Sequence, residues 1–228
     1  MIKKIFKYIL KKTGKTYAID ESVPNRLLVE FLINRCIMLL RGLFFLRKKV
    51  FLGTNCNISN KSNLQFGKNV TFESNVAVDG YAKNKLIFGD RVKIGSSSII
   101  SCTSHLSMYG LGLTIGNNSA VGRFCEFGSA GGITIGNDVI MGSYVSFHSQ
   151  NHNFDVPERL IREQGVTSKG IVLKNNIWVG AKVTFLDGAE VGNNCVVAAG
   201  SLVKGVFPDN VVIGGVPAKI IKNLFDQA

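Results

Sequence analysis

The sequence predicts a mainly β protein in which most of the chain coils into a solenoid of six-residue repeats, preceded by a helical segment. Two observations support this prediction. Aliphatic residues recur every six positions from about residue 51, usually followed two residues later by glycine or another small residue. The chain also contains 25 glycines but only 4 prolines. This composition suits many short strands joined by tight turns and is unusual for a helix bundle.

The repeat is visible in runs such as LIFGDR, VKIGSS, LTIGNN, ITIGND, VIMGSY and IWVGAK. Six residues are enough for one short strand and one turn, so three repeats close a triangular coil whose aliphatic side chains point inward. Gly, Asn, Asp and Ser gather at the corners, where the backbone needs tight or positive-φ conformations. Each coil needs neighbours to satisfy its backbone hydrogen bonds. We therefore expect roughly eight stacked coils of about eighteen residues between about residues 52 and 216.

Residues 1–50 carry most of the positive charge. The formal net charge is +12, and this segment contributes +9 of it, with 12 Lys and Arg against 3 Asp and Glu. The other 178 residues therefore carry only +3, so the basic character does not belong to the repeats. Basic residues interleaved with large apolar ones favour an anionic lipid surface over nucleic acid, and no nucleic-acid partner is expected.

Two apolar stretches lie in this basic segment, joined by a polar linker. Residues 1–12 place Ile, Leu and Phe at helical spacing between lysines, which predicts an amphipathic helix. Residues 27–46 are strongly apolar but contain Glu30, Arg35 and Arg41. Each charge would cost about 2.5–3.5 kcal/mol near the bilayer centre, so a spanning helix is not expected. Two interpretations stay open: a helical hairpin on the membrane surface, favoured by the basic residues 47–49, or a helical element packed on a neighbouring subunit.

The repeat is interrupted at residues 145–165, VSFHSQNHNFDVPERLIREQG. Long polar excursions from a rigid scaffold often carry binding or catalysis. This one contains two of the three histidines, His148 and His152. We therefore expect the functional site at this interruption.

The five cysteines are widely spaced and include no C-x-x-C pair. Neither a disulfide framework nor a zinc site is predicted, which favours a reducing, cytoplasmic setting. A metal site built on His148 and His152 would need a third ligand, and only His105 and scattered cysteines remain. No metal is expected.

Several runs together carry a family resemblance: ITIGND-VIMGSY, then SQNHNFD with IREQG, then IWVGAKVTFLDGAEVGNNCVVAAGSLVKG, and finally GGVPAKIIK. They resemble the hexapeptide-repeat acyltransferases, in particular the sugar and polysaccharide O-acetyltransferase branch, over about residues 60–222. The resemblance implies a left-handed parallel β-helix, an exception to the right-handed crossover rule. It also implies a homotrimer that holds acetyl-CoA between neighbouring coil stacks.

On this basis we expect three regions. Residues 1–50 would be the basic helical segment, associating with a membrane or packing on a subunit. Residues 51–222 would form the acetyltransferase domain, with an extended catalytic loop at 148–170, and residues 223–228 a C-terminal tail.

The resemblance also implies roles in acetyl transfer. A sugar hydroxyl is a poor nucleophile until its proton can leave, and imidazole, which titrates near neutrality, suits the role of base. His152 matches the catalytic histidine of the family and is expected to be this base, while His148 would line the pocket. The acceptor contacts would include Glu126, with Asn84 a weaker candidate. For Asn151, contact with the acceptor and contact with the backbone of its own loop are both open. For Asp155, a role toward the histidine or the acceptor and a role as a turn former are both open.

The expected coenzyme contacts lie where the repeat resumes. Backbone groups of two alanines would meet the pantetheine amides, and lysines near the end of the solenoid would meet the phosphates. Trp178 would be a wall for the pantetheine arm, a core or trimer contact, or both. The full set is Trp178, Gly180, Ala181, Ala199, Lys204, Gly205, Lys219 and Lys222. The lysine at 204 is displaced by one residue from the usual family position.

The leading hypothesis is therefore an acetyl-CoA-dependent O-acetyltransferase that acts at the cytoplasmic membrane face. Its acceptor would be a sugar hydroxyl of a bacterial surface polysaccharide or of the lipid-linked precursor, with backbone amides near Ala181 stabilising the oxyanion. The alternatives are an N-acetyltransferase acting on an amino sugar or antibiotic, and a non-catalytic scaffold for glycan-synthesis enzymes. The SQNHNFD motif argues against the scaffold.

Overall fold

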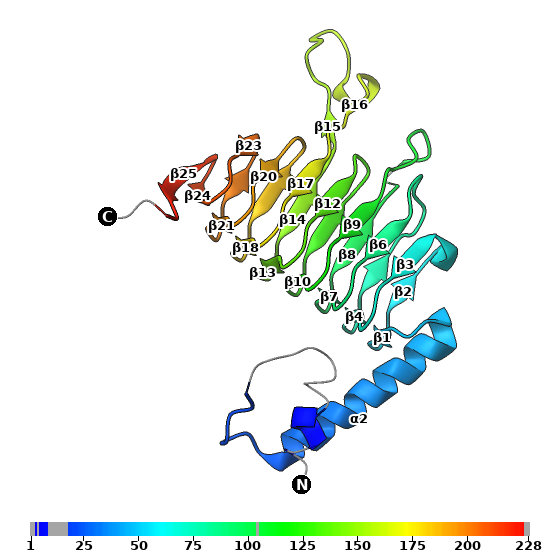
Figure 1. Ribbon diagram of the computed structural model, residues 1–228. Helices are drawn as coiled ribbons and strands as arrows, with labels where there is room; N and C mark the ends of the chain where they lie inside the picture. Colours follow the sequence, from blue (N-terminus) through cyan, green and yellow to red (C-terminus); the bar gives the residue numbers. More distant parts are fainter. Residues whose placement is uncertain (1–2, 4, 9–17, 104, 226–228) are drawn as a thin grey trace.

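The computed structural model describes residues 3, 5–8, 18–103 and 105–225. Figure 1 shows a prism of stacked coils with a long helix at one end and the C-terminus at the other. The coils form a left-handed parallel β-helix, so the predicted fold class is confirmed. This architecture presents three flat faces and three corners, and both carry functional candidates.

Three parallel sheets form the faces of the prism. Sheet A contains, in spatial order, β1 (Phe51–Leu52), β4 (Thr71–Phe72), β7 (Lys93–Ile94), β10 (Ala120–Val121), β13 (Ile140–Met141), β18 (Trp178–Val179), β21 (Val196–Val197), β24 (Val211–Gly215) and the antiparallel β25 (Ala218–Asn223). Sheet B contains β2 (Asn57–Ile58), β5 (Ala77–Val78), β8 (Ile99–Ser101), β11 (Glu126–Gly128), β14 (Ser146–His148), β19 (Thr184–Leu186) and β22 (Leu202–Val203). Sheet C contains β3 (Leu64–Phe66), β6 (Leu86–Phe88), β9 (Leu113–Ile115), β12 (Ile133–Ile135), β17 (Ile171–Leu173), β20 (Glu190–Val191) and β23 (Val206–Phe207).

Most coils are longer than the eighteen residues that we expected. In sheet A, Phe51 pairs with Thr71, twenty residues along the chain. An eighteen-residue step does occur from Trp178 to Val196. The expected length was therefore wrong for most of the stack. At the two corners on either side of sheet C, the step from the start of one strand to the start of the next is usually seven residues or more instead of six.

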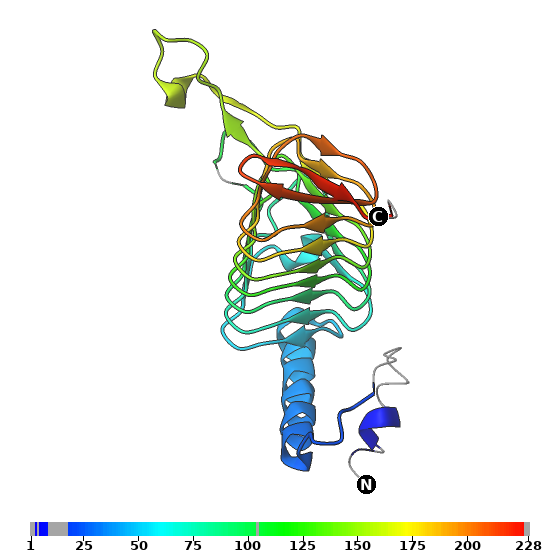
Figure 2. The same ribbon diagram turned by 90° about the vertical axis from the view of Figure 1, so that its left-hand side faces the viewer.

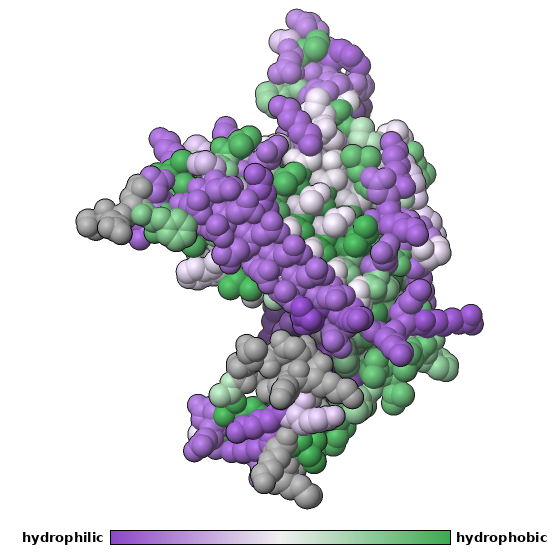
Figure 3. Space-filling model, viewed as in Figure 1, coloured by the Kyte–Doolittle hydropathy of each residue, from purple (hydrophilic) through white to green (hydrophobic). Residues whose placement is uncertain are grey.

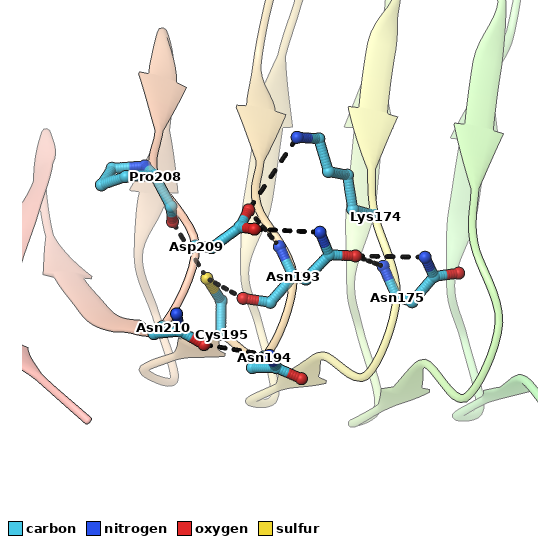
Figure 4. A network of polar contacts seen from close by, with 8 residues as sticks. All are labelled: Lys174, Asn175, Asn193, Asn194, Cys195, Pro208, Asp209 and Asn210. Atoms are coloured by element: carbon cyan, nitrogen blue, oxygen red, sulfur yellow. Dashed lines mark hydrogen bonds and ion pairs between the residues drawn. The ribbon is translucent and has the colours of Figure 1, made fainter. Parts of the chain in front are cut away.

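The corner between sheets C and A, the CA corner, explains the recurring Asn and Asp residues. In each coil after the first, one residue is left-handed and points its N–H at the preceding coil, as Asn194 does toward the carbonyl of Asn175 at 3.0 Å. The side chain of the residue before it accepts a backbone N–H from the preceding coil (Figure 4). Asn175 N–H donates to Asn193 Oδ1 at 3.1 Å, and Asn193 N–H donates to Asp209 Oδ1 at 2.8 Å. Equivalent bonds extend this ladder back to Lys68.

The corner between sheets A and B, the AB corner, has a constant length. From each sheet A strand to the following sheet B strand the step is six residues, as from Trp178 to Thr184. Here too one residue per coil is left-handed and donates its N–H to the preceding coil. The large excursions of the described chain, residues 79–85, 102–112 and 149–170, all leave the prism at the third corner, the BC corner between sheets B and C.

The interior of the prism is a column of aliphatic and aromatic side chains. Phe127, Phe147 and Phe185 are fully buried behind sheet B, and their rings stack at centroid distances of 4.8 and 4.7 Å. Burial of each such side chain stabilises the fold by about 1.5–3 kcal/mol. The column makes the prism a rigid support for the loops at its corners.

The helix α2 (Asn25–Arg41) continues as the π-helix η1 (Gly42–Leu46) and packs on the first coils. The guanidinium of Arg35 lies 3.2 Å from the centre of the Phe51 ring and donates to Thr71 Oγ1 at 2.9 Å. Burial lowers the pKa of Arg35 to about 10, which still leaves it charged at neutral pH. The charge thus fastens the helix to sheet A.

The amphipathic helix expected over residues 1–12 lies largely outside the described residues. Within that range residues 5–8 are helical, and Phe6 packs with its ring centroid 5.5 Å from that of Phe31. Across the described ranges, we find no helix with both the length and the hydropathy needed to cross a membrane. Two short 3-10 helices, η2 (Lys61–Asn63) and η3 (Ile161–Glu163), lie in loops.

The ladder at the CA corner can be tested with Asn175→Ala. This change removes the acceptor of the Asn137 N–H bond, 2.8 Å long, and the side-chain bond to Asn193. We expect the free energy of unfolding, measured by urea denaturation, to fall by about 1 kcal/mol. The control is Asn57→Ala, whose exposed side chain makes no hydrogen bond with a described residue and which should shift stability by less than about 0.5 kcal/mol. Equal stability of the two variants would contradict the structural role of the ladder.

Candidate active site

His152 lies on a two-stranded hairpin outside the prism. β15 (Asn151–His152) pairs in antiparallel fashion with β16 (Val166–Thr167), with His152 opposite Val166 and Asn151 opposite Thr167. Figures 1 and 2 both show this hairpin extending away from the stacked coils. The imidazole of His152 is exposed and makes no hydrogen bond or ion pair with a described residue. It is therefore free to meet a ligand.

Both feet of the hairpin are anchored to the BC corner. The hydroxyl of Ser149 is buried, donates to the carbonyl of Gly128 at 2.7 Å and accepts from Gly131 N–H at 2.9 Å. On the returning strand, Lys169 N–H donates to Asp187 Oδ1 at 2.7 Å. The hairpin is thus fixed where it leaves the prism.

The tip of the excursion is held by its own side chains. Gln164 accepts from Val156 N–H at 3.0 Å and donates to the carbonyls of Val156 and Arg159 at 2.9 and 2.8 Å. Arg159 in turn donates to the carbonyl of Glu163 at 2.6 Å. Asp155 is exposed and makes no contact with His152 that would fix its tautomer within the described chain.

Two further candidates share the outer face of sheet B. His148, exposed at the end of β14, lies between Gly128 on one side and Leu186 on the other. Glu126 is also exposed and is aligned with Ser146 in the next coil. Because alternate residues of a strand share a face, Glu126 and His148 point to the same side. A Cβ at Gly128, beside His148, would come within 3.1 Å of the carbonyl oxygen of Phe147.

The AB corner presents backbone N–H groups that have no acceptor among the described residues. Elsewhere on this corner a serine of the next coil accepts such a group, as Ser143 Oγ accepts from Arg123 N–H at 3.4 Å. The N–H groups of Ala181 and Ala199 donate to no described residue. For Ala181 the reason is that the equivalent residue of the next coil is Ala199, which lacks the hydroxyl of a serine. Gly180 has a steric role, because a Cβ there would come within 2.5 Å of Ala199 N.

The remaining coenzyme candidates do not gather at one place. Trp178 is exposed on the outer face of sheet A, and Lys219 and Lys222 lie on β25 at the C-terminal edge of the same sheet. Lys204 and Gly205 instead follow β22 at the BC corner, the corner that bears the hairpin. Sheet B separates this corner from the AB corner. The predicted residues are therefore divided among sheet A, the AB corner and the BC corner.

A feature that sequence reasoning missed is an aromatic pair on the AB corner. Phe124 and Tyr144 are 49% and 54% exposed, and their rings stack at 5.1 Å with an interplanar angle of 9°. Both are left-handed, with φ of 55° and 61°, a conformation that is strained for bulky side chains. The sequence did contain an indication of this pair. The repeats SAVGRF and VIMGSY end in an aromatic residue at the position where the repeat VKIGSS ends in serine.

A shallow cavity of about 270 Å³ lies across the BC corner on sheet C. Its lining includes Asn84, Lys85 and Lys169 together with the backbone of Gly131 and Gly170. Asn84 thus lies at the foot of the hairpin but on a different face from Glu126. Over the described ranges, no three His, Cys, Asp or Glu side chains come together in a way that could hold a metal ion.

Comparison with known proteins adds sequence relatives and a solved structure. Residues 170–205 match the family described as bacterial transferase hexapeptide (six repeats). An Escherichia coli K12 protein that bears the provisional name lipopolysaccharide biosynthesis O-acetyl transferase is 51% identical over 55 residues, 24% of this chain and 28% of that protein. The 2,3,4,5-tetrahydropyridine-2,6-dicarboxylate N-acetyltransferase of Clostridium perfringens is 39% identical over 56 residues, 25% of this chain and 24% of that protein. The chain thus spans about a quarter of the length of each relative.

Among solved structures, a hexapeptide-repeat-containing acetyltransferase of Vibrio cholerae in complex with acetyl coenzyme A superposes with a TM-score of 0.52. The two sequences are 25% identical, and the match covers 61% of this chain and 71% of that chain. The match therefore covers more than half of this chain.

Thiol reactivity provides a test of the coil packing. Burial raises the pKa of Cys102 to about 11 and also raises the pKa of Cys56, Cys125 and Cys195. Cys36 is exposed. Because the thiolate is the reactive form and a raised pKa lowers its fraction, an aromatic disulfide reagent at pH 8 should rapidly modify Cys36 and the others slowly. Denaturation should release five reactive thiols, and rapid modification of Cys102 in the folded protein would contradict its burial.

Proposed function

Because this chain belongs to the hexapeptide-repeat transferases, we propose that it is an acetyl-CoA-dependent O-acetyltransferase whose acceptor is a sugar hydroxyl. The observation that carries the proposal is the anchored hairpin that presents an unpaired His152 outside the repeat. The similarity to an Escherichia coli protein named for lipopolysaccharide biosynthesis supports a sugar of a bacterial surface polysaccharide, or its lipid-linked precursor, as acceptor.

The chemistry assigns one role to His152. Its unprotonated ring nitrogen accepts the proton of the sugar hydroxyl while the sugar oxygen attacks the carbonyl carbon of the thioester. Backbone N–H groups near Ala181 stabilise the negative charge on the carbonyl oxygen of the tetrahedral intermediate. When the carbon–sulfur bond breaks, the proton passes from the imidazolium to the leaving thiolate. The products are the acetylated sugar and free coenzyme A.

The proposed site needs two chains. His152, Lys204 and Gly205 belong to the BC corner, whereas the unpaired N–H groups of Ala181 and Ala199 belong to the AB corner. If the BC corner of one chain faces the AB corner of the next, both sets line one groove. Closed cyclic symmetry then repeats the groove at every contact, and we propose that the ring is a homotrimer.

A second candidate acceptor is an amine. The similarity to a Clostridium perfringens N-acetyltransferase supports it, since the same base would take the proton that an attacking amine loses. Comparison of kcat/KM on matched hydroxy and amino sugars separates the two candidates. A preference for the amino sugar would replace the O-acetyl proposal.

We expect His152→Ala to lower kcat by roughly 10²–10⁴, the contribution of a general base. Coenzyme A release should be followed with a thiol reagent over a panel of sugars, in a Cys36→Ser background that removes the exposed protein thiol. The matched control is His148→Ala, which should affect KM more than kcat. Full activity of His152→Ala together with an inactive His148→Ala would reverse the assignment.

A mixed assembly tests whether the site is shared. We expect His152→Ala and Ala199→Trp to be inactive separately, the second because the indole would cover the exposed AB corner. Randomly co-assembled chains should recover about a quarter of the wild-type activity, since one groove in four would combine two intact halves. No recovery, in mixtures that native mass spectrometry shows to have exchanged chains, would place the whole site in a single chain.

A further inference from the structure

Helix α2 and the following η1 display an apolar stripe to solvent. Ile33, Ile37, Leu40 and Phe44 succeed one another at steps of four, three and four residues, the spacing of one helix face. Their side chains are 55%, 40%, 65% and 80% exposed. Figure 3 shows green, apolar surface in the lower part of the molecule, where α2 lies. An exposed contiguous apolar face of this kind marks an interaction surface.

The stripe faces away from the β-helix. The opposite side of α2 carries the Arg35 side chain that stacks on Phe51 and the buried Met38, while Leu28 packs in a separate cluster with Phe6. Helix and prism are therefore packed together through one side, and the stripe is left on the other. In Figures 1 and 2, α2 and the His152 hairpin lie at opposite ends of the molecule, so the stripe does not overlap the proposed active site.

A basic cluster follows the stripe directly. Arg47, Lys48 and Lys49 are exposed, and none forms an ion pair with a described residue. They belong to the segment of residues 1–50 that carries +9 of the net charge. A surface that combines exposed aromatic and aliphatic side chains with unpaired cations complements anionic headgroups above an apolar layer.

A cavity of about 480 Å³ adjoins this surface, between η1 and the first coil. Apolar side chains of Phe45, Leu46 and Ile58 line it together with the cationic Arg41 and Lys61. Both cations donate to backbone carbonyls, Arg41 at 3.4 Å and Lys61 at 3.0 Å, and each retains further N–H donors. The cavity thus combines apolar walls with donors suited to a phosphate.

We propose that the stripe, together with residues 47–49, docks this protein on the surface of an anionic lipid bilayer. The positive charge of this surface favours a lipid bilayer over a second copy of the same face as the binding partner. Pairing two copies would bring two segments of +9 together, and like charges repel, whereas an anionic surface attracts each Lys or Arg close to it. The proposal does not depend on the acetyl-transfer proposal, because the two surfaces are separate.

Co-sedimentation of the full-length protein with vesicles tests the proposal. We expect binding to vesicles of phosphatidylcholine containing phosphatidylglycerol, much weaker binding to phosphatidylcholine alone, and partial release at 1 M salt, where the screening length falls to about 3 Å. Lys48→Ala with Lys49→Ala should weaken partitioning about 30-fold. Phe44→Ser should weaken it about tenfold or more.

Matched variants on the β-helix serve as controls. Lys68→Ala with Lys83→Ala removes two exposed lysines, and Val206→Ser removes an exposed apolar side chain, and neither should change partitioning. Failure of the full-length protein to bind anionic vesicles would overturn the proposal. So would equal binding of the residue 48–49 variant and its control. Loss of oligomer mass in Phe44→Ser with unchanged vesicle binding would overturn it in favour of a second copy as the occupant of the stripe.

Discussion

The left-handed turn at the AB and CA corners is the constraint on which the rest of the structure depends. A residue with φ near +60° turns its N–H along the solenoid axis, so that it donates to a carbonyl of the preceding coil. At the CA corner, stacked Asn and Asp side chains add a second set of bonds between coils. Because each coil is bonded to the next at these points, a longer loop there would break the ladder. Excursions of the described chain are confined to the BC corner.

This confinement positions the proposed chemistry. The hairpin with His152 leaves at the BC corner, and the unpaired N–H groups of Ala181 and Ala199 lie at the AB corner. Alanine at these two positions leaves an N–H group of the neighbouring coil without the acceptor that a serine hydroxyl would supply. The strained Phe124 and Tyr144 lie on the same corner. Departures from the corner pattern thus gather where a ligand is proposed to bind.

Arg35 shows how a charge in an apolar run can have a meaning that hydropathy does not reveal. In sequence it argues against insertion in a bilayer. In the fold it stacks on Phe51, donates to Thr71 and holds α2 against sheet A. The apolar residues on the other side of the helix are left uncovered as a result. The charge of Arg35 therefore argues against a membrane-spanning helix. Its contacts with sheet A also decide which side of α2 is exposed as the proposed docking face.

The sequence by itself determined the solenoid, its interruption and the position of His152 within that interruption, because a six-residue period and a break in it are local patterns. It also indicated the helical character of residues 27–46. Only the tertiary structure decided coil length and corner identity, since an extra residue at one corner shifts every later position around the prism. Ala199 and Lys204 are five residues apart in sequence, yet they lie at different corners. Which predicted side chains belong together is therefore a property of the assembled coils and not of their spacing along the chain.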